Sequence, residues 1–407
     1  MKLAAALLLV LVALPCAAQQ RTLQDFFNSK GFKQKVIKPP NGMLKRQYLV
    51  PDGPYTHLFD WDMYFMGVAL SYDGVGKPVA SSVQDFLEYV DESADWHGYT
   101  PREIATDALW SLPEMCKPFM AQAALRASRT MGDVSWLLEK STGGKWESNY
   151  DKLAAMLSFW ENNRKSADGL FVWYNGVESG IDNSPVVSDK PSLVTEGVDL
   201  QCYIYREYLA MTVLAERLGK KDDAALYASK AVDLKKLVAS RMWNDKDGMF
   251  YNIDSRTGGM VKIKEWTNLT PLWAGIASPE QAKRLIDGHV LNTREFWAEK
   301  GLRTLSADEP LYDAKNGYWR GPVWVVSSYM LMHGLYNYGY KKEAAELADK
   351  VVGLLTADLN KTGGMNETYN PETGEPTSAG NFLSWNLLSE HMIEEAQTGN
   401  DASAIVW

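Results

Sequence analysis

Two short loops carry the residues that are best suited to catalysis. Asp182 lies in the segment Val177-Glu-Ser-Gly-Ile-Asp-Asn-Ser-Pro185, and Glu367 lies in Met365-Asn-Glu-Thr-Tyr-Asn-Pro371. Two carboxyl groups on facing loops are what glycoside hydrolysis requires, because one protonates the leaving oxygen while the other activates a water. Glycine and proline occur at or near both segments, which favours loops over helices. The pattern therefore predicts a pair of catalytic carboxyl groups across one opening.

The neighbours of the two acids indicate which role each plays. Trp173 and Tyr174 lie close to Asp182 in the sequence, and desolvation beside aromatic rings raises the pKa of a carboxyl group. We therefore expect Asp182 to be the protonated acid. Polar residues such as Asn366 surround Glu367, so we expect Glu367 to be the ionised base. For inversion the two carboxyl groups must lie about 6.5–9.5 Å apart, which leaves room for a water.

Other residues near these acids are candidates for substrate binding, each with an alternative role. Gly180 allows the backbone to approach a ligand, and Glu178 holds either Asp182 or an arginine in place. Asp60 and Asp62 cap a helix, bind a pair of sugar hydroxyls or supply one ligand to a calcium ion. Because the chain has 51 acidic residues, a capping or surface role is the default for any single one.

Three turns are predicted to place the loops on one rim. They are Asp168–Phe171, Asp247–Phe250 and Gly363–Asn366, and each contains a glycine suited to the left-handed conformation that ends a helix. The segment after the first turn carries Asp182, and the segment after the third carries Glu367. If the preceding helices run in the same direction around a ring, the two acids face each other across its mouth.

Helical periodicity dominates the rest of the chain. Apolar residues recur at steps of three and four from Ile204 to Leu218 and from Tyr227 to Met242. Residues 218–228 align without gaps on residues 338–348, which indicates an internal repeat. About twelve helical segments pair into about six hairpins, and hairpins repeating in this way stack as a solenoid or close into a ring. We predict the ring, an all-α (α/α)6 barrel with small β-hairpins in its rim loops, formed by a single domain over residues 19–407.

Composition narrows the range of partners. The formal net charge is −9, which disfavours nucleic acid and anionic membranes as partners. The chain has 15 Trp, 20 Tyr and 12 Phe, and this aromatic content fits either a large core or a sugar-binding site. The five histidines form no i, i+4 pair, and no C-x-x-C motif, phosphate-binding loop or G-x-S-x-G motif occurs. We therefore expect no metal and no cofactor in the chemistry.

The first residues have the features of a cleavable signal peptide. Lys2 precedes an apolar run from Leu3 to Leu14, and Cys16-Ala-Ala18 resembles a cleavage site. We expect residues 1–18 to be removed and the mature protein to be periplasmic or secreted, without membrane insertion. Two cysteines then remain, Cys116 and Cys202, either as a disulfide or as buried free thiols.

Five motifs in order resemble one enzyme family. They are Phe59-Asp-Trp-Asp-Met-Tyr64, Glu178-Ser-Gly-Ile-Asp-Asn-Ser-Pro185, Gly317-Tyr-Trp-Arg-Gly-Pro-Val-Trp324, Asn366-Glu-Thr-Tyr-Asn-Pro371 and Asn381-Phe-Leu-Ser-Trp385. Together they resemble glycoside hydrolase family 63, which includes processing α-glucosidase and mannosylglycerate hydrolase, and its trehalase relatives. The resemblance implies an (α/α)6 barrel and an inverting, exo-acting α-glycosidase that uses no metal.

The resemblance also implies roles for single residues. It makes Asp182 the acid and Glu367 the base, and it places Trp61 and Asp62 around the sugar in the −1 subsite. One departure concerns Lys117, which stands where relatives often carry a neutral amide in an S-x-Q-P-P segment. Its ammonium group either favours an anionic aglycone such as glycerate or points to solvent. The other residues implied to bind substrate or close the pocket are Phe59, Trp319, Arg320, Tyr369 and Trp385.

We therefore interpret the sequence as an exo-acting, inverting α-glycosidase of small α-glucosides or α-mannosides. Trehalase activity and mannosylglycerate or glucosylglycerate hydrolysis are specific alternatives. A sugar-binding barrel without catalysis is the alternative from another class, and a lyase or epimerase on the same barrel is a third. A lyase acting on polyanionic uronates fits poorly with the negative charge of the chain.

Overall fold

The structure is a computed structural model that describes residues 18–140 and 145–407. The predicted signal peptide lies outside these residues except for Ala18, so it stays a prediction, as does cleavage near Cys16. Within the described part of the chain, no helix combines the length and apolar character needed to cross a bilayer.

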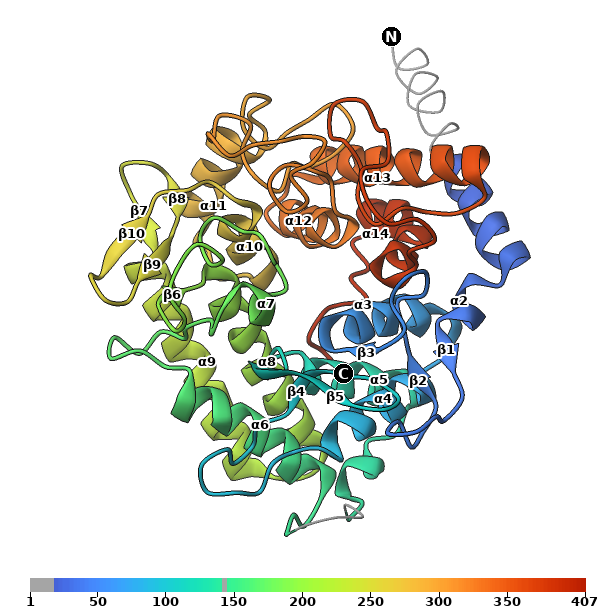
Figure 1. Ribbon diagram of the computed structural model, residues 1–407. Helices are drawn as coiled ribbons and strands as arrows, with labels where there is room; N and C mark the ends of the chain where they lie inside the picture. Colours follow the sequence, from blue (N-terminus) through green and yellow to red (C-terminus); the bar gives the residue numbers. More distant parts are fainter. Residues whose placement is uncertain (1–17, 141–144) are drawn as a thin grey trace, which may run out of the picture.

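An inner ring of helices surrounds the centre of the molecule (Figure 1). Each inner element packs against the next along the chain, and the last packs against the first, so the ring is closed. All residues of the first inner helix, D-W-D-M-Y-F-M-G-V-A-L, are buried, as expected for a helix that is covered on every side. In chain order the inner elements are α3 (Asp60–Leu70), α5 (Met120–Met131), α8 (Val198–Arg217), α10 (Thr270–Ala274), α12 (Val325–Asn337) and η5 (Ser384–Glu390), which α14 (Met392–Thr398) continues.

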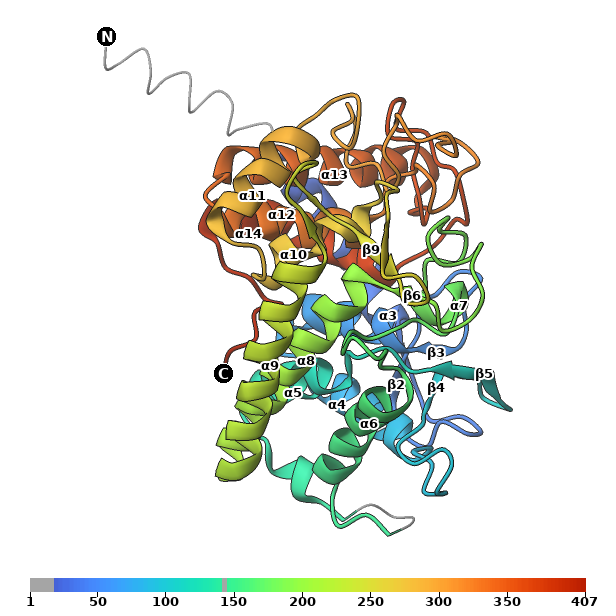
Figure 2. The same ribbon diagram turned by 90° about the vertical axis from the view of Figure 1, so that its left-hand side faces the viewer.

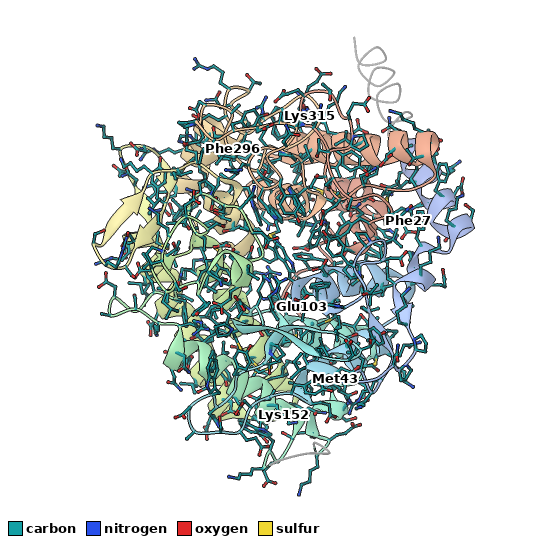
Figure 3. All side chains as sticks on the ribbon, in the orientation of Figure 1. Phe27, Met43, Glu103, Lys152, Phe296 and Lys315 are labelled. Carbon is teal, nitrogen blue, oxygen red and sulfur yellow. The ribbon has the colours of Figure 1, made fainter. Side chains whose placement is uncertain are left out.

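An outer layer alternates with the inner ring along the sequence. The apolar stripe predicted from Tyr227 to Val238 is the buried face of α9, whereas much of the rest of that helix is exposed. The helical residues 18–30 join this layer beside α13, where Phe27 is buried (Figure 3). The other outer helices are α4 (Lys77–Leu87), α6 (Asn149–Asn163), α9 (Lys221–Arg241), α11 (Pro279–Leu285) and α13 (Lys341–Thr362). The predicted (α/α)6 barrel is therefore confirmed.

Short strands and loops gather at one end of the barrel, where Figure 2 shows β3, β4, β5 and α7. The antiparallel sheet β3-β4-β5 links Leu58–Phe59, Pro101–Ile104 and Leu109–Met115. Each of the three predicted turns contains a glycine with a positive φ angle: Gly169, Gly248 and Gly363. The remaining elements are α2 (Phe32–Lys35), β1 (Ile37–Lys38), β2 (Tyr48–Leu49), η1 (Ser71–Asp73), η2 (Ser135–Leu138), α7 (Gly176–Ser179), β6 (Thr195–Glu196), β7 (Trp243–Asn244), β8 (Met249–Phe250), β9 (Asn252–Asp254), β10 (Gly259–Val261), η3 (Trp266–Leu269) and η4 (Ile286–Val290).

The last residues of the chain cover the opposite end of the barrel (Figure 2). Arg126 donates to the Ala404 carbonyl at 3.1 Å, and Trp273 donates to the Ser403 hydroxyl at 3.3 Å. His333 lies 3.3 Å from Glu395 and 3.6 Å from Asp401 and is buried beside them. This end of the barrel is thus held by buried charges.

The charge on His333 should make stability depend on pH. Burial alone would lower its pKa, but Asp401 and Glu395 outweigh burial and raise the pKa above 6.5. A group whose pKa is raised on folding stabilises the fold while it is protonated, and that contribution disappears as the pH rises through the folded-state pKa. We therefore expect melting temperatures to fall by a few degrees between about pH 6 and about pH 9.

The variant His333→Gln should be less stable at about pH 6 and should lose much of this fall, which thermal melts at several pH values would measure. His97→Gln, at an exposed histidine, serves as the control. An equal fall in the wild type and in His333→Gln would contradict the assignment.

The two remaining cysteines, Cys116 and Cys202, are both buried and unpaired. Of the two alternatives, buried free thiols are therefore correct.

Candidate active site

One pocket at the loop-bearing rim contains both predicted catalytic acids. It is a small pocket, with about 60 Å³ of space open to the centre of a water molecule. Asp182 and Glu367 come from loops that are far apart in the sequence, and the fold brings both to its walls. The lining residues are Pro51, Tyr55, Phe59, Asp60, Trp61, Asp62, Arg102, Gly180, Asp182, Tyr318, Trp319, Trp324, Glu367, Phe382 and Trp385.

Indole rings form a continuous wall of the pocket. Trp61 lies 5.9 Å from Trp319 and 5.2 Å from Trp385, measured between ring centroids. Trp319 stacks on Trp324 at 3.6 Å with nearly parallel planes. The indole nitrogens of Trp319 and Trp385 are buried and find no acceptor among the described residues. Two hydrogen-bond donors are therefore available beside flat apolar faces, as a sugar ring with its hydroxyls requires.

The first turn of α3 supplies two carboxyl groups with different surroundings. Asp60 accepts the backbone N–H groups of Trp61 and Lys117, both at 2.7 Å, so it anchors the backbone. Asp62 accepts the Ser384 hydroxyl at 2.6 Å. Burial, together with the nearby charge of Asp60, raises the pKa of Asp62 to about 7, although Ser384 and Lys117 act against it. Both residues line the pocket, and Asp60 also anchors the backbone.

The loop that carries Asp182 is fixed by the residues that follow it. Asn183 accepts the Trp319 N–H at 3.1 Å and donates to the Gly317 carbonyl at 2.8 Å. Ser184 donates to the buried Glu265 carboxylate at 2.6 Å. The Asp182 side chain itself remains exposed to the solvent of the pocket. These bonds hold the acid loop against the aromatic wall.

Nearby protein raises the pKa of Asp182, and the origin of this effect differs from the prediction. Burial raises the pKa, while the charges of Arg102 and Lys117 oppose the rise. Trp173, which the sequence suggested as the source of desolvation, donates instead to Asp199 at 3.0 Å. Tyr174 lies against the Arg164 guanidinium. Neither aromatic lines the pocket.

The Glu367 carboxyl group is almost completely buried, with 4% of the residue exposed. Its backbone N–H donates to the Ala379 carbonyl at 2.9 Å, and its Oε1 accepts the Tyr55 hydroxyl at 2.9 Å. Burial raises its pKa to about 7, with a further rise from Asp62 and Asp182, while the Tyr55 and Ser378 hydrogen bonds lower it. The sequence predicted an ionised residue with polar neighbours, and the structure instead raises the pKa of this carboxyl group towards neutral pH.

Six of the residues predicted to bind substrate line the pocket, and four do not. Those that line it are Phe59, Trp61, Asp62, Gly180, Trp319 and Trp385. At Gly180, whose φ is +76°, a side chain would come within 3.0 Å of the Trp61 ring and within 2.8 Å of Lys117. Glycine is therefore required there for the acid loop to pack on the pocket floor.

Glu178 and Lys117 are buried behind the pocket, so their predicted contact with substrate needs correction. Glu178 pairs with Arg164 at 3.2 Å, which matches the alternative that it holds an arginine. Lys117 lies 3.2 Å from Asp60 and 5.1 Å from the centre of the Trp61 ring, with its side chain fully buried. Its ammonium group therefore neither points to solvent nor lines the pocket.

Arg320 and Tyr369 likewise lie outside the pocket lining. The Arg320 carbonyl accepts the Asp313 N–H at 2.8 Å, as part of the turn that presents Trp319. Tyr369 donates its hydroxyl to Asp358 at 2.7 Å behind the Glu367 loop. Both support loops that line the pocket.

Sequence reasoning missed several residues of the pocket wall. Tyr55 and Tyr318 carry phenol groups near Glu367, and Tyr318 has a φ of +57°, a strained conformation for a residue with a side chain. Arg102 lies over the Phe59 ring and donates to the Val177 carbonyl at 2.8 Å. Tyr318 could have been found from its place beside Trp319. Tyr55 and Arg102 lie in segments without any recognisable motif.

Comparison with known proteins places the chain in a family. The model of the mannosylglycerate hydrolase MGH1-like glycoside hydrolase domain matches residues 103–385. The chain belongs to this family. The resemblance to glycoside hydrolase family 63 that the motifs indicate is confirmed.

Several curated proteins are similar to this member of the family. A mannosylglycerate hydrolase of Rubrobacter radiotolerans is 26% identical over 222 residues, which cover 53% of this chain and 48% of that protein. Mannosylglycerate hydrolase MGH1 of Selaginella moellendorffii is 34% identical over 141 residues, covering 34% of this chain and 26% of that protein. The matches thus span about half of these relatives or less.

Solved structures share the fold. The mannosylglycerate hydrolase of Thermus thermophilus, solved in complex with glucose, aligns with a TM-score of 0.65 at 19% identity, over 90% of this chain and 98% of that one. The neutral trehalase of Saccharomyces cerevisiae aligns with a TM-score of 0.63 at 16% identity, over 88% and 75%. These likenesses show a common barrel.

The hydrogen bond from Tyr55 to Glu367 should control the pKa of that carboxyl group. A donor favours the ionised form, so Tyr55→Phe should raise the Glu367 pKa above its value of about 7. Carboxyl 13C shifts of a protein labelled at glutamate would follow the titration, with the signal assigned by its loss in Glu367→Gln. Tyr99→Phe, which removes a hydroxyl bonded to a backbone carbonyl, is the matched control. An unchanged or lowered Glu367 pKa in Tyr55→Phe would refute this role.

Proposed function

We propose that this chain is an inverting, exo-acting α-glycosidase that hydrolyses small α-glucosides or α-mannosides. The observation that carries the proposal is that Asp182 and Glu367, from loops far apart in sequence, line one pocket with an indole wall. The family assignment supports glycoside hydrolysis. The small volume of the pocket supports action on a single terminal sugar.

In the proposed mechanism, Asp182 donates its proton to the glycosidic oxygen as the bond to the anomeric carbon breaks. Glu367 removes a proton from a water that attacks this carbon from the opposite face. The solvent-exposed position of Asp182 gives the leaving aglycone a way out. The buried position of Glu367 excludes bulk water, and a base pKa near the working pH favours proton transfer.

Substrate specificity can be tested directly with a panel of α-linked compounds: trehalose, glucosylglycerate, mannosylglycerate and α-linked glucose disaccharides. On the glycerate-linked substrates, which release only one sugar, proton NMR during the first turnovers should show the β-anomer, because inversion changes an α-linkage into a β-product. An initial α-anomer from a glycerate-linked substrate would overturn inversion. Binding by calorimetry without any product would favour the non-catalytic sugar-binding protein, and an unsaturated product would favour a lyase.

Variants of the two acids should respond differently to a change of the leaving group. Asp182→Asn and Glu367→Gln should each slow disaccharide hydrolysis by about 100-fold or more, while sugar binding measured by calorimetry persists. An α-glycosyl fluoride needs no proton on its leaving group, so Asp182→Asn should recover most of its rate on this substrate. Glu367→Gln should stay slow on both substrates.

Asp189→Asn, in an exposed position of the same loop as Asp182, is the matched control and should behave as the wild type. Near wild-type disaccharide rates in Asp182→Asn or Glu367→Gln would refute the mechanism. Recovery on the fluoride in Glu367→Gln instead of Asp182→Asn would exchange the two roles.

One observation favours a glycerate-linked compound as the substrate. Arg102 lines the pocket, and its charge opposes the rise that burial causes in the pKa of Asp182. A cation beside the proton donor lies near the position of the leaving group, where it would attract a carboxylate. The sequence offered Lys117 for this role as one of two alternatives, and we propose Arg102 in its place because Arg102 lines the pocket. The names of the relatives from Rubrobacter and Selaginella agree with this choice.

The variant Arg102→Gln should therefore raise KM for mannosylglycerate or glucosylglycerate by about tenfold or more, because a charge-assisted contact is lost. KM for a neutral α-glucoside should change little. The comparison is made at the pH optimum of each variant, because losing Arg102 also raises the pKa of Asp182. Equal effects on charged and neutral substrates would argue against the glycerate assignment.

We also propose that the protein acts in the periplasm or outside the cell, on the basis of residues 1–18. Cell fractionation with and without these residues would test the location.

A further inference from the structure

A buried aspartate behind the base loop has no part in the proposed mechanism. Asp358 lies in the last turn of α13, and 4% of it is exposed. A negative charge near the C-terminal end of a helix is unfavourable, because the helix dipole is negative there. Its surroundings must therefore supply the stabilisation, and they come mainly from the loop that carries Glu367.

One oxygen of Asp358 accepts three hydrogen bonds from this loop. Its Oδ2 accepts the Asn366 backbone N–H at 3.0 Å, the Asn366 side-chain amide at 2.8 Å and the Tyr369 hydroxyl at 2.7 Å. The other oxygen accepts the Thr362 hydroxyl at 3.0 Å. The Tyr369 hydroxyl also accepts the Asn366 N–H at 2.8 Å. These bonds join both ends of the turn 366–369 to a single carboxylate.

Glu367 lies between the two residues that Asp358 holds. Its own backbone N–H donates to Ala379, and Tyr369 pairs with Val323 as an isolated β-bridge, so the turn is supported from two further sides. Asp358 differs from these supports because it is charged, and hydrogen bonds to a charged acceptor are stronger than neutral ones. It also ties the turn to the end of the long helix α13.

We propose that Asp358 is a positioning residue that fixes the carboxyl group of Glu367 against the sugar pocket. This inference rests on the proposed function, in which Glu367 is the base. A base must lie within hydrogen-bond reach of the attacking water, and a small displacement slows the reaction strongly. Asp358 itself touches neither the pocket nor a reacting atom among the residues described.

The test is Asp358→Asn, which keeps the size of the side chain but replaces one acceptor oxygen with a donor and removes the charge. The expected result is a fall in kcat of about 10- to 100-fold with KM changed less than about threefold. The loss should be as large on an α-glycosyl fluoride as on a disaccharide, because the base acts on both. Asp349→Asn, on the same helix and about 13 Å farther from its C-terminus, is the matched control.

A second measurement separates this inference from the proposed function. Amide hydrogen exchange at residues 366–369 should be faster in Asp358→Asn than in the wild type or in Asp349→Asn, whether or not the protein cleaves glycosides. Wild-type protein that hydrolyses none of the panel would refute the proposed function alone. Unchanged exchange, or an unchanged kcat in an active protein, would overturn the role of Asp358. If Asp358→Asn does not fold, Tyr369→Phe removes one of the three bonds and should give the same effects in weaker form.

Discussion

Three carboxyl groups share one partly dry pocket, and this crowding is the constraint on which the rest of the site depends. Asp62, Asp182 and Glu367 each lose hydration there, and the pKa of each is raised. The charges of Asp62 and Asp182 both add to the rise at Glu367. Full ionisation of all three would be costly, so the pocket holds at least part of one proton near neutral pH. An acid and a base can therefore coexist in one pocket.

The surrounding residues limit this effect. Arg102 and Lys117 lower the pKa of Asp182, and hydroxyl donors lower the pKa values of the other two acids. Lys117 does so from a buried position, where Asp60 balances its charge at 3.2 Å. An isolated buried ammonium group would be very unfavourable. The pair of Lys117 and Asp60 thus brings positive charge beneath the pocket without exposing it to a ligand.

Closure of the barrel brings these groups together. The first inner helix, α3, carries Trp61 and Asp62, whereas the last inner element, η5, carries Ser384 and Trp385. The contact between the two elements closes the ring, and it also makes the hydrogen bond between Ser384 and Asp62. The indole wall crosses the same seam. Part of the site is therefore formed by the same contact that closes the barrel.

Local patterns explain how much could be predicted from the sequence. Periodicity identified the stripe on α9, and glycine placement identified the turns before the loops of Asp182 and Glu367, because these signals act over a few residues. Tyr55 and Arg102 could not be found in this way, since each acts on a residue far away in the chain. The direction of Trp173 was predicted wrongly for a related reason. Closeness in sequence placed it beside Asp182, but the turn between them sends the indole to Asp199.

The raised pKa of Glu367 shows that its sequence neighbours predicted the wrong direction for the pKa shift. Polar neighbours along the chain predicted an ionised base, yet Asn366 points its amide to Asp358, and Thr368 bonds Ser378 instead of the carboxylate. What remains around Glu367 is burial, the hydroxyls of Tyr55 and Ser378 and two other acids. The polar residues of this segment stabilise the shape of the loop, and the pocket sets the proton affinity of its acid. The sequence neighbours of a catalytic residue therefore mainly determine how its loop is held in place.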